Sequence, residues 1–164
     1  NVAEGTIFRY FKTKKDLLKS IIKPTLVKTI APFEMDRFSK AVFHLEYETF
    51  EDFLNALIKN RMEFAKKNKA AVKIIIQEMP FQDDMQEELK RLFKDKMYPK
   101  VATVLQSFID KGQIKELPIP TVLRLIISTV IGLVISSIVL ENTPFWNEEQ
   151  ETERTIEFIK NGLN

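Results

Sequence analysis

The sequence predicts an all-α fold, with a short basic segment at the N-terminus and a larger helical body behind it. Apolar residues recur at helical spacing along most of the 164 residues, and no strand-like alternation persists. Two pairs, Thr13 with Asp16 and Thr49 with Asp52, have the spacing of a capping box, with Asp in place of the usual Glu. Each pair stands immediately before an apolar run, where a helix is expected to begin.

Charge divides the chain into two parts. Residues 1–30 contain seven Lys and Arg against two Asp and Glu, a net charge of +5; because the whole chain carries +2, the rest carries −3. A basic head on a mildly acidic body is typical of nucleic-acid-binding proteins, although a solvated helix face explains the charge alone equally well. We therefore divide the chain into a head and linking helix, 1–30, and a body, 31–164.

Composition excludes several classes of protein. Hydrophobic residues make up 45% and charged residues 29%, as in ordinary globular proteins, and the length suffices for one domain with a sizeable core. With no Cys there are no disulfides and no thiolate chemistry, which agrees with a reducing cytoplasm. The sequence contains one histidine, His44, and no glycine-rich phosphate loop. We predict neither an enzyme nor a bound metal or cofactor.

The N-terminal segment has the features of a DNA-reading helix followed by a braced second helix. Ile7 and Phe11 lie four residues apart on one helix face, which leaves aromatic and basic side chains on the remaining surface. The cap at Thr13 then opens a second apolar run. A short helix of this kind suits the major groove and its flanking phosphates.

This stretch resembles the end of the helix-turn-helix in tetracycline-repressor-like (TetR/AcrR) transcriptional regulators, where a recognition helix with a Gly-Thr pair and a Tyr-Phe leads into a basic capped helix. The chain begins inside the turn, so we expect the first helices of the motif to be missing and the 164 residues alone not to bind DNA specifically. The resemblance implies a cytoplasmic homodimer that binds operator DNA, as a repressor by family habit, and responds to a small-molecule inducer.

On matching positions, the resemblance assigns DNA contacts to Glu4, Gly5, Thr6, Phe8, Arg9, Tyr10, Lys12 and Lys14. Arg9 suits a bidentate contact with guanine, worth about 1–3 kcal/mol of discrimination. Glu4 suits a cytosine amine, or alternatively the positive end of the helix dipole. Tyr10, Lys12 and Lys14 would hold phosphates.

The first part of the body follows the linking helix. The apolar stripe of residues 17–30 is interrupted near Pro24, and 31–48 is a connector of uncertain form whose aromatic residues we expect to fold onto the body. From Thr49 a helix should run to the basic stretch at 66–69, followed by a short helix over 70–79. A long helix over 83–111, kinked at Pro99, should end at Gly112.

Residues 122–140 are the most apolar segment, with no charge from 125 onward, and a final helix covers about 147–162. The run is short of the roughly 20 residues that a membrane span needs and contains several hydroxyl side chains, so we expect no span. Two further interpretations stay open, a central core helix of a monomer and a dimer interface. The resemblance favours an intermolecular four-helix bundle made by the last two helices. Its predicted contacts are Ser128, Gly132, Ser136, Ile156 and Ile159.

Thirteen Phe and five Met in a helical body suggest an adaptable apolar cavity, although most of them must be core. The resemblance implies that such a cavity binds the inducer, which we expect to be apolar or amphipathic. The predicted pocket residues are Phe53, Leu57, Phe64, Ile75, Gln77, Phe93, Met97, Tyr98, Val101, Phe108 and Ile131, with Glu78 and His44 as further candidate polar anchors. The alternative function is a helical protein-interaction module with a basic docking end.

Overall fold

The computed structural model describes residues 31–164, and every regular element in this range is helical, which confirms the all-α fold class. The elements are α3 (Ala31–Val42), α4 (Phe50–Lys67), α5 (Lys69–Glu78), the 3₁₀ turn η2 (Met79–Phe81), α6 (Asp83–Leu92), the π-helical turn η3 (Phe93–Met97), α7 (Tyr98–Asp110), α8 (Ile119–Val139) and α9 (Glu148–Leu163). The eight predicted DNA-binding residues and the linking helix lie outside the described residues.

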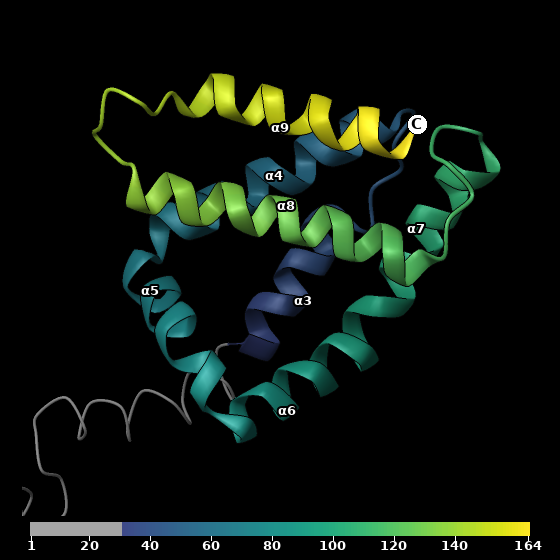
Figure 1. Ribbon diagram of the computed structural model, residues 1–164. Coiled ribbons are helices and arrows are strands. Elements are labelled where there is room, and N and C mark those ends of the chain that lie inside the picture. The colour runs from purple at the N-terminus through teal and green to yellow at the C-terminus, as the bar shows by residue number, and fades with distance from the viewer. Residues whose placement is uncertain (1–30) are drawn as a thin grey trace, which may run out of the picture.

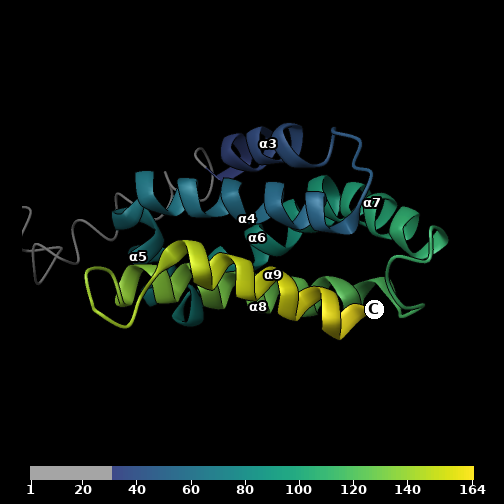
Figure 2. The same ribbon diagram turned by 90° about the horizontal axis from the view of Figure 1, so that it is seen from above.

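Helix α4 is the centre of the body. It contacts α3 on one side and the pair α8 and α9 on the other, so the helices form successive layers (Figures 1 and 2). Its buried residues lie along its whole length, from Phe50 to Ala65. Helices α8 and α9 lie side by side, joined by a loop at one end, and α5, α6 and η3 connect α4 to α7 around the other side (Figure 1).

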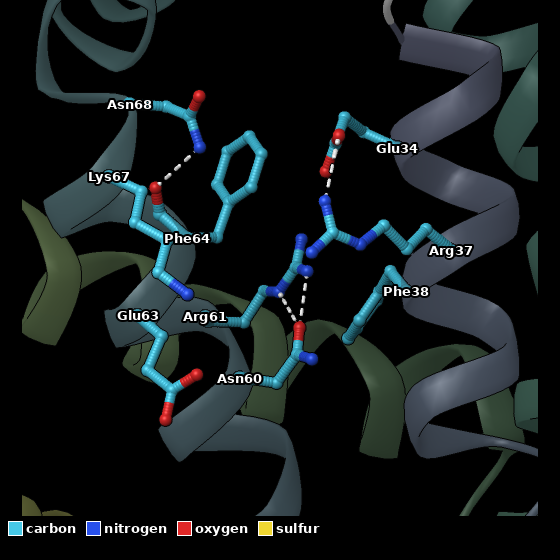
Figure 3. A pocket seen from close by; sticks show the side chains of 9 residues that line it. All are labelled: Glu34, Arg37, Phe38, Asn60, Arg61, Glu63, Phe64, Lys67 and Asn68. Atoms are coloured by element: carbon cyan, nitrogen blue, oxygen red, sulfur yellow. Dashed lines mark hydrogen bonds and ion pairs between the residues drawn. The ribbon is translucent and has the colours of Figure 1, made fainter.

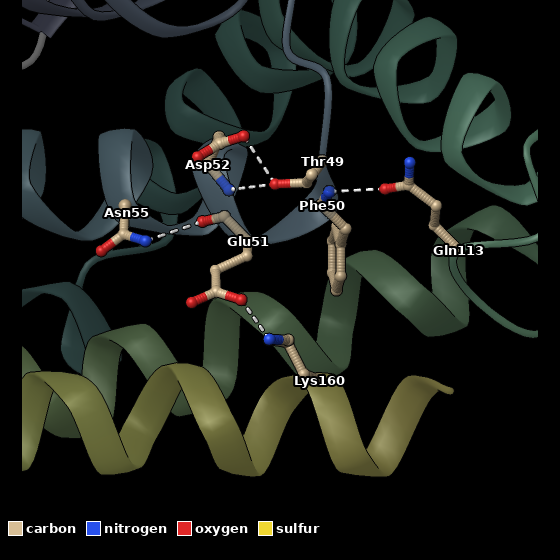
Figure 4. A network of polar contacts seen from close by, with 7 residues as sticks. All are labelled: Thr49, Phe50, Glu51, Asp52, Asn55, Gln113 and Lys160. Carbon is tan, nitrogen blue, oxygen red and sulfur yellow. Dashed lines mark hydrogen bonds and ion pairs between the residues drawn. The ribbon is translucent and has the colours of Figure 1, made fainter.

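The predicted cap at the start of α4 is confirmed, with the difference that Asp52 accepts from the Thr49 hydroxyl and not from the Thr49 backbone N–H. The Thr49 hydroxyl accepts a hydrogen bond from the Asp52 backbone N–H at 3.1 Å and donates one to the Asp52 carboxylate at 2.6 Å (Figure 4). Acidic residues follow in the first turn, and Lys66 and Lys67 occupy the last, where they complement the helix dipole. The predicted beginning and end of this helix are therefore correct.

The connector predicted over 31–48 is largely a helix, α3. An i,i+4 ion pair between Asp36 and Lys40, with N and O 3.0 Å apart, supports its exposed side. Phe38, Phe43 and Tyr47 pack against the core, as expected for aromatics folding back onto the body, whereas Phe33 is 66% exposed and does not. The sequence indicates this helix only weakly because Pro32 interrupts the apolar pattern near the start of α3. A proline is nevertheless tolerated in the first turn of a helix.

The predicted long helix with a kink at Pro99 is two helices joined by a π-helical turn. Proline lacks an N–H, and its ring clashes with the carbonyl four residues earlier, so the α-helical hydrogen-bond ladder cannot continue through it. Just before the proline the helix changes to the wider π-helical hydrogen-bonding pattern. The Tyr98 N–H bonds to the Phe93 carbonyl, five residues earlier. The position of the irregularity was predicted, and its form was not.

Helix α7 ends in a Schellman motif that also holds the start of α4. The Gly112 N–H bonds to the Ile109 carbonyl at 2.8 Å and the Gln113 N–H to the Phe108 carbonyl at 2.9 Å, with Gly112 in the left-handed region at φ 68°. This turn presents the Gln113 side chain to α4, where it accepts from the Phe50 N–H at 2.6 Å (Figure 4).

Helix α9 begins at the Asn147 cap, whose side chain accepts from the Gln150 N–H, as its acidic start suggested. Ile156 and Ile159 are only 6% and 4% exposed within the single chain. Their assignment to the dimer interface is therefore wrong: they belong to the core with α4 and α8, and a second copy could not reach them without opening that core.

Within residues 31–164 one helix, α8, is long and apolar enough to cross a membrane by length and composition alone. The core helix of a globular protein passes the same test. Its buried residues, from Val122 to Leu133, all pack into the core cluster, so α8 has a clear role within the body.

Two glycines should respond oppositely to substitution. Gly112→Ala places a side chain in the left-handed region and should lower the free energy of unfolding by about 1–2 kcal/mol. Gly162→Ala lies in α9, where an added Cβ meets nothing within 4 Å, and should raise it by about 0.5–1 kcal/mol. Urea unfolding followed by circular dichroism measures both changes; equal effects of the same sign would contradict the Schellman motif.

Candidate functional site

An apolar groove of about 630 Å³ runs between the junction of η3 with α7 and the N-terminal half of α8. Its size falls within the range of small-molecule sites. It is lined by Phe93, Tyr98, Pro120, Leu123, Arg124, Ile127, Ser128 and Ile131. We call this surface the η3–α8 groove.

The π-helical turn gives one wall of the groove its shape. Because the turn contains an additional residue, it changes which way the following side chains face, and such turns are frequent at functional sites. The Phe93 and Tyr98 rings are placed on either end of it, with centroids 6.4 Å apart and planes inclined by 59°. Pro99 therefore acts indirectly on the groove, since it is the cause of the turn.

The opposite wall is an apolar stripe of α8 with one cation at its side. Leu123, Ile127 and Ile131 repeat every four residues, and the two isoleucines are 37% and 51% exposed. Arg124 is the one charged side chain among the lining residues. An apolar surface beside a guanidinium suits an amphipathic molecule with an anionic group.

The structure brings three of the predicted pocket residues together, Phe93, Tyr98 and Ile131. Five others lie in the close-packed interior: Phe53, Leu57, Met97, Val101 and Phe108 are between 1% and 9% exposed. Phe53 and Phe108 pack within an aromatic cluster, with ring centroids 5.7 Å apart and planes inclined by 43°. The assignment of these five to a pocket wall is corrected to core, because neighbouring side chains already fill the space around them.

The remaining predicted pocket residues are dispersed. Phe64 lines a separate, small polar pocket between α3 and α4. Ile75 is half-buried on α5, and Gln77 and His44 are exposed, so none of these three belongs to the η3–α8 groove.

The small residues of α8 lie on its outer face. Ser128 and Gly132 are exposed and Ser136 is half-buried, and a Cβ built on Gly132 meets nothing within 4 Å. The seam predicted from their spacing is therefore accessible to another surface. Val139, on the same helix, is 70% exposed, and Phe158 of α9 is 68% exposed.

Three residues of the groove, Leu123, Ile127 and Arg124, were not among the predicted site residues. Leu123 and Ile127 lie in an uncharged helix. Its sequence has no periodic change of polarity that would distinguish the core face from the outer face. A signal did exist for Arg124, which is the last charge before the apolar run. Within residues 31–164, no group of three His, Cys, Asp or Glu side chains could hold a metal ion.

No protein-family model matches the chain, and no curated protein matches it by sequence. Among solved structures, the crystal structure of the transcriptional regulator FadR from Bacillus subtilis, in complex with stearoyl-CoA, aligns with 99% of this chain and 83% of its own. The TM-score is 0.63 and the sequence identity is 22%. The chain has the fold of a helical transcriptional regulator. At this identity the alignment shows the fold alone.

If the η3–α8 groove is an apolar binding surface, the dye 1-anilinonaphthalene-8-sulfonate should fluoresce on binding to it. The double variant Ile127→Ser, Ile131→Ser should lower dye affinity about tenfold or more, because two exposed apolar contacts of about 1 kcal/mol each are removed. Val139→Ser, on the same helix outside the groove, is the matched control. Equal losses in both proteins would show that the dye binds elsewhere.

Proposed function

We propose that this protein is a DNA-binding transcriptional regulator of the tetracycline-repressor type, most simply a repressor, whose activity responds to a small amphipathic molecule. The observation that carries the proposal is the pairing of a regulator fold over 99% of the chain with a basic N-terminal segment of +5 that has the composition of a recognition helix. A regulator of this kind acts in the cytoplasm and needs no catalytic group.

The ligand we propose has an apolar chain and an anionic head. The η3–α8 groove supports this class because it combines an isoleucine stripe with Arg124. The stearoyl-CoA bound by the FadR of similar fold is a molecule of this class, with a long acyl chain and phosphates. A fatty acyl thioester or a fatty acid is accordingly the first ligand to test.

The proposed mechanism couples the groove to the head through α3. The π-helical turn η3 lines the groove and also contacts α3, which follows the N-terminal segment directly in sequence. A ligand that moves Phe93 or Tyr98 would displace α3 and change the spacing of two heads on DNA. The ligand would then weaken operator binding.

Binding to the DNA upstream of its own gene tests the function. The protein with its helix-turn-helix in full should bind with salt-dependent, saturable affinity, and Lys14→Ala should reduce the slope of log K against log salt by about 1 without changing sequence preference. Fluorescence anisotropy at several salt concentrations measures the slope. Lys115→Ala, an exposed lysine near the far end of the body, serves as the control and should leave the slope unchanged.

Absence of DNA binding would overturn the proposal and favour the alternative, a protein-interaction module that docks through its basic end. An unchanged salt slope in Lys14→Ala, with sequence-selective binding intact, would remove only the phosphate role of Lys14.

We also propose that the regulator is a homodimer that pairs through the outer face of α8. The exposed seam of Ser128, Gly132 and Ser136 would let a second helix approach closely, and Phe158 of α9 would lie beside it. The last two helices of each copy would then form a four-helix bundle.

Gly132→Glu tests the dimer without disturbing the body, because the space around this position is open. The variant should sediment as a folded monomer at concentrations where the wild type is a dimer, since a carboxylate would be buried in the seam. Gln106→Glu, exposed on α7, adds the same charge and should leave the dimer intact. A dimeric Gly132→Glu protein would place the interface elsewhere.

A further inference from the structure

A second, polar pocket lies between α3 and α4, on a different part of the body from the η3–α8 groove (Figure 3). Its volume is about 70 Å³. This is too small for a drug-sized ligand and suits a single compact group. Its floor is the side chain of Arg61 from the middle of α4.

Arg61 is held rigidly. Its guanidinium carbon lies 3.6 Å from the centroid of the Phe38 ring and 5.1 Å from that of Phe64, and two of its nitrogens donate to the side-chain oxygen of Asn60 (Figure 3). Ring stacking and the Asn60 contacts fix the orientation of the fork, which has five N–H donors in all. The guanidinium is therefore held in one orientation, and it has N–H donors that the Asn60 contacts do not use.

The positive charge of Arg61 is not neutralised by an ion pair. Among the described residues, no carboxylate lies within 4 Å of its guanidinium; the nearby Glu34 pairs instead with Arg37, with O and N 3.6 Å apart. Burial lowers the pKa of Arg61 to about 10, partly offset by the charge of Glu34. A partly desolvated cation with no carboxylate in direct contact is unfavourable, and a bound anion would relieve that cost.

A second guanidinium faces the first. Figure 3 shows the Arg37 and Arg61 side chains directed toward one another from α3 and α4, while the Glu63 carboxylate points away from them. Lys67 also lines the pocket, so three cations and two carboxylates surround it. Two like charges that converge from separate helices repel each other unless an anion lies between them.

We propose that this pocket binds a compact oxyanion, a phosphate or carboxylate group, held by the Arg61 guanidinium from α4 and the Arg37 guanidinium from α3. A guanidinium fork matches the oxygens of either group bidentately, which makes both chemistries possible. Because the two cations come from different helices, the bound anion would fasten α3 to α4. The site is separate from the η3–α8 groove and does not depend on the protein binding DNA.

Thermal unfolding of the full chain with added inorganic phosphate tests the site, and sodium acetate in a parallel series tests the carboxylate. Ionic strength is held constant by replacing chloride. A saturable rise of Tm is expected with at least one of the two anions, since a ligand that binds only the folded state stabilises it. The series that saturates identifies the group, and no rise beyond that in chloride with either anion overturns the proposal.

Three variants locate the effect. Arg61→Gln should lower the affinity for the anion at least about tenfold, as expected for the loss of charge-assisted hydrogen bonds. Arg154→Gln removes the same charge from an exposed, ion-paired position of α9 and should keep the wild-type response. If Arg61→Gln does not fold, the double variant Arg37→Gln, Lys67→Gln carries the test, because both side chains are exposed at the rim. A wild-type response in the variant tested would overturn the assignment.

Discussion

The junction between the N-terminus of α4 and the C-terminus of α7 fixes the frame of the body. Phe50 and Gln113 are 63 residues apart in sequence. The Phe50 N–H donates a hydrogen bond of 2.6 Å to the Gln113 side-chain oxygen, which joins these two parts of the chain. The Phe108 ring contacts those of Phe50 and Phe53, at centroid distances of 5.4 and 5.7 Å, and the latter two rings are 6.2 Å apart. Polar and apolar contacts thus fix the same two helix ends, and their geometry depends on one left-handed glycine, Gly112.

The remaining helices are positioned against this frame. Helix α9 packs on α4 and α8 through Ile156, Ile159 and Leu163, and ion pairs cross its surface from Lys66 to Glu148 and from Lys160 to Glu51. Exposed pairs of this kind contribute little to stability. The buried isoleucines, rather than the charges, therefore determine where α9 lies.

Helix α8 buries one side of its apolar surface against other helices of the same chain and leaves another side exposed. Val122, Ile126 and Val130 are buried, while the stripe of Ile127 and Ile131 and the seam of Ser128 and Gly132 remain accessible. Successive residues of a helix are separated by about 100°, so these two accessible rows adjoin, and Ser128 both belongs to the seam and lines the η3–α8 groove. A ligand in the groove and a second copy of the chain on the seam would therefore meet at Ser128.

The sequence predicted the features that depend on local chemistry. The Thr49 cap, the Gly112 end and the disturbance at Pro99 each follow from what one or two residues do to the backbone, and the structure has all three. Which apolar residues face a cavity depends instead on helix packing. Phe53 and Phe93 look alike in sequence, but the first stacks in the core and the second lines the groove.

Helix α3 lines the Arg61 pocket and also contacts η3, which lines the η3–α8 groove. Ser39 of α3 is 1% exposed and accepts a hydrogen bond at 2.7 Å from Lys100, two residues beyond the groove residue Tyr98. On the side of α3 that faces α4, the Phe38 ring lies against the Arg61 guanidinium. Both contacts are polar or cation–π contacts rather than an interlocked apolar seam, and such contacts can be exchanged at a smaller cost than core packing. Helix α3 also contributes Val42 and Phe38 to the apolar core and its edge, so only its polar and cation–π contacts could be exchanged when either site changes. Because α3 follows the basic N-terminal segment directly in sequence, a shift of α3 would reach that segment first.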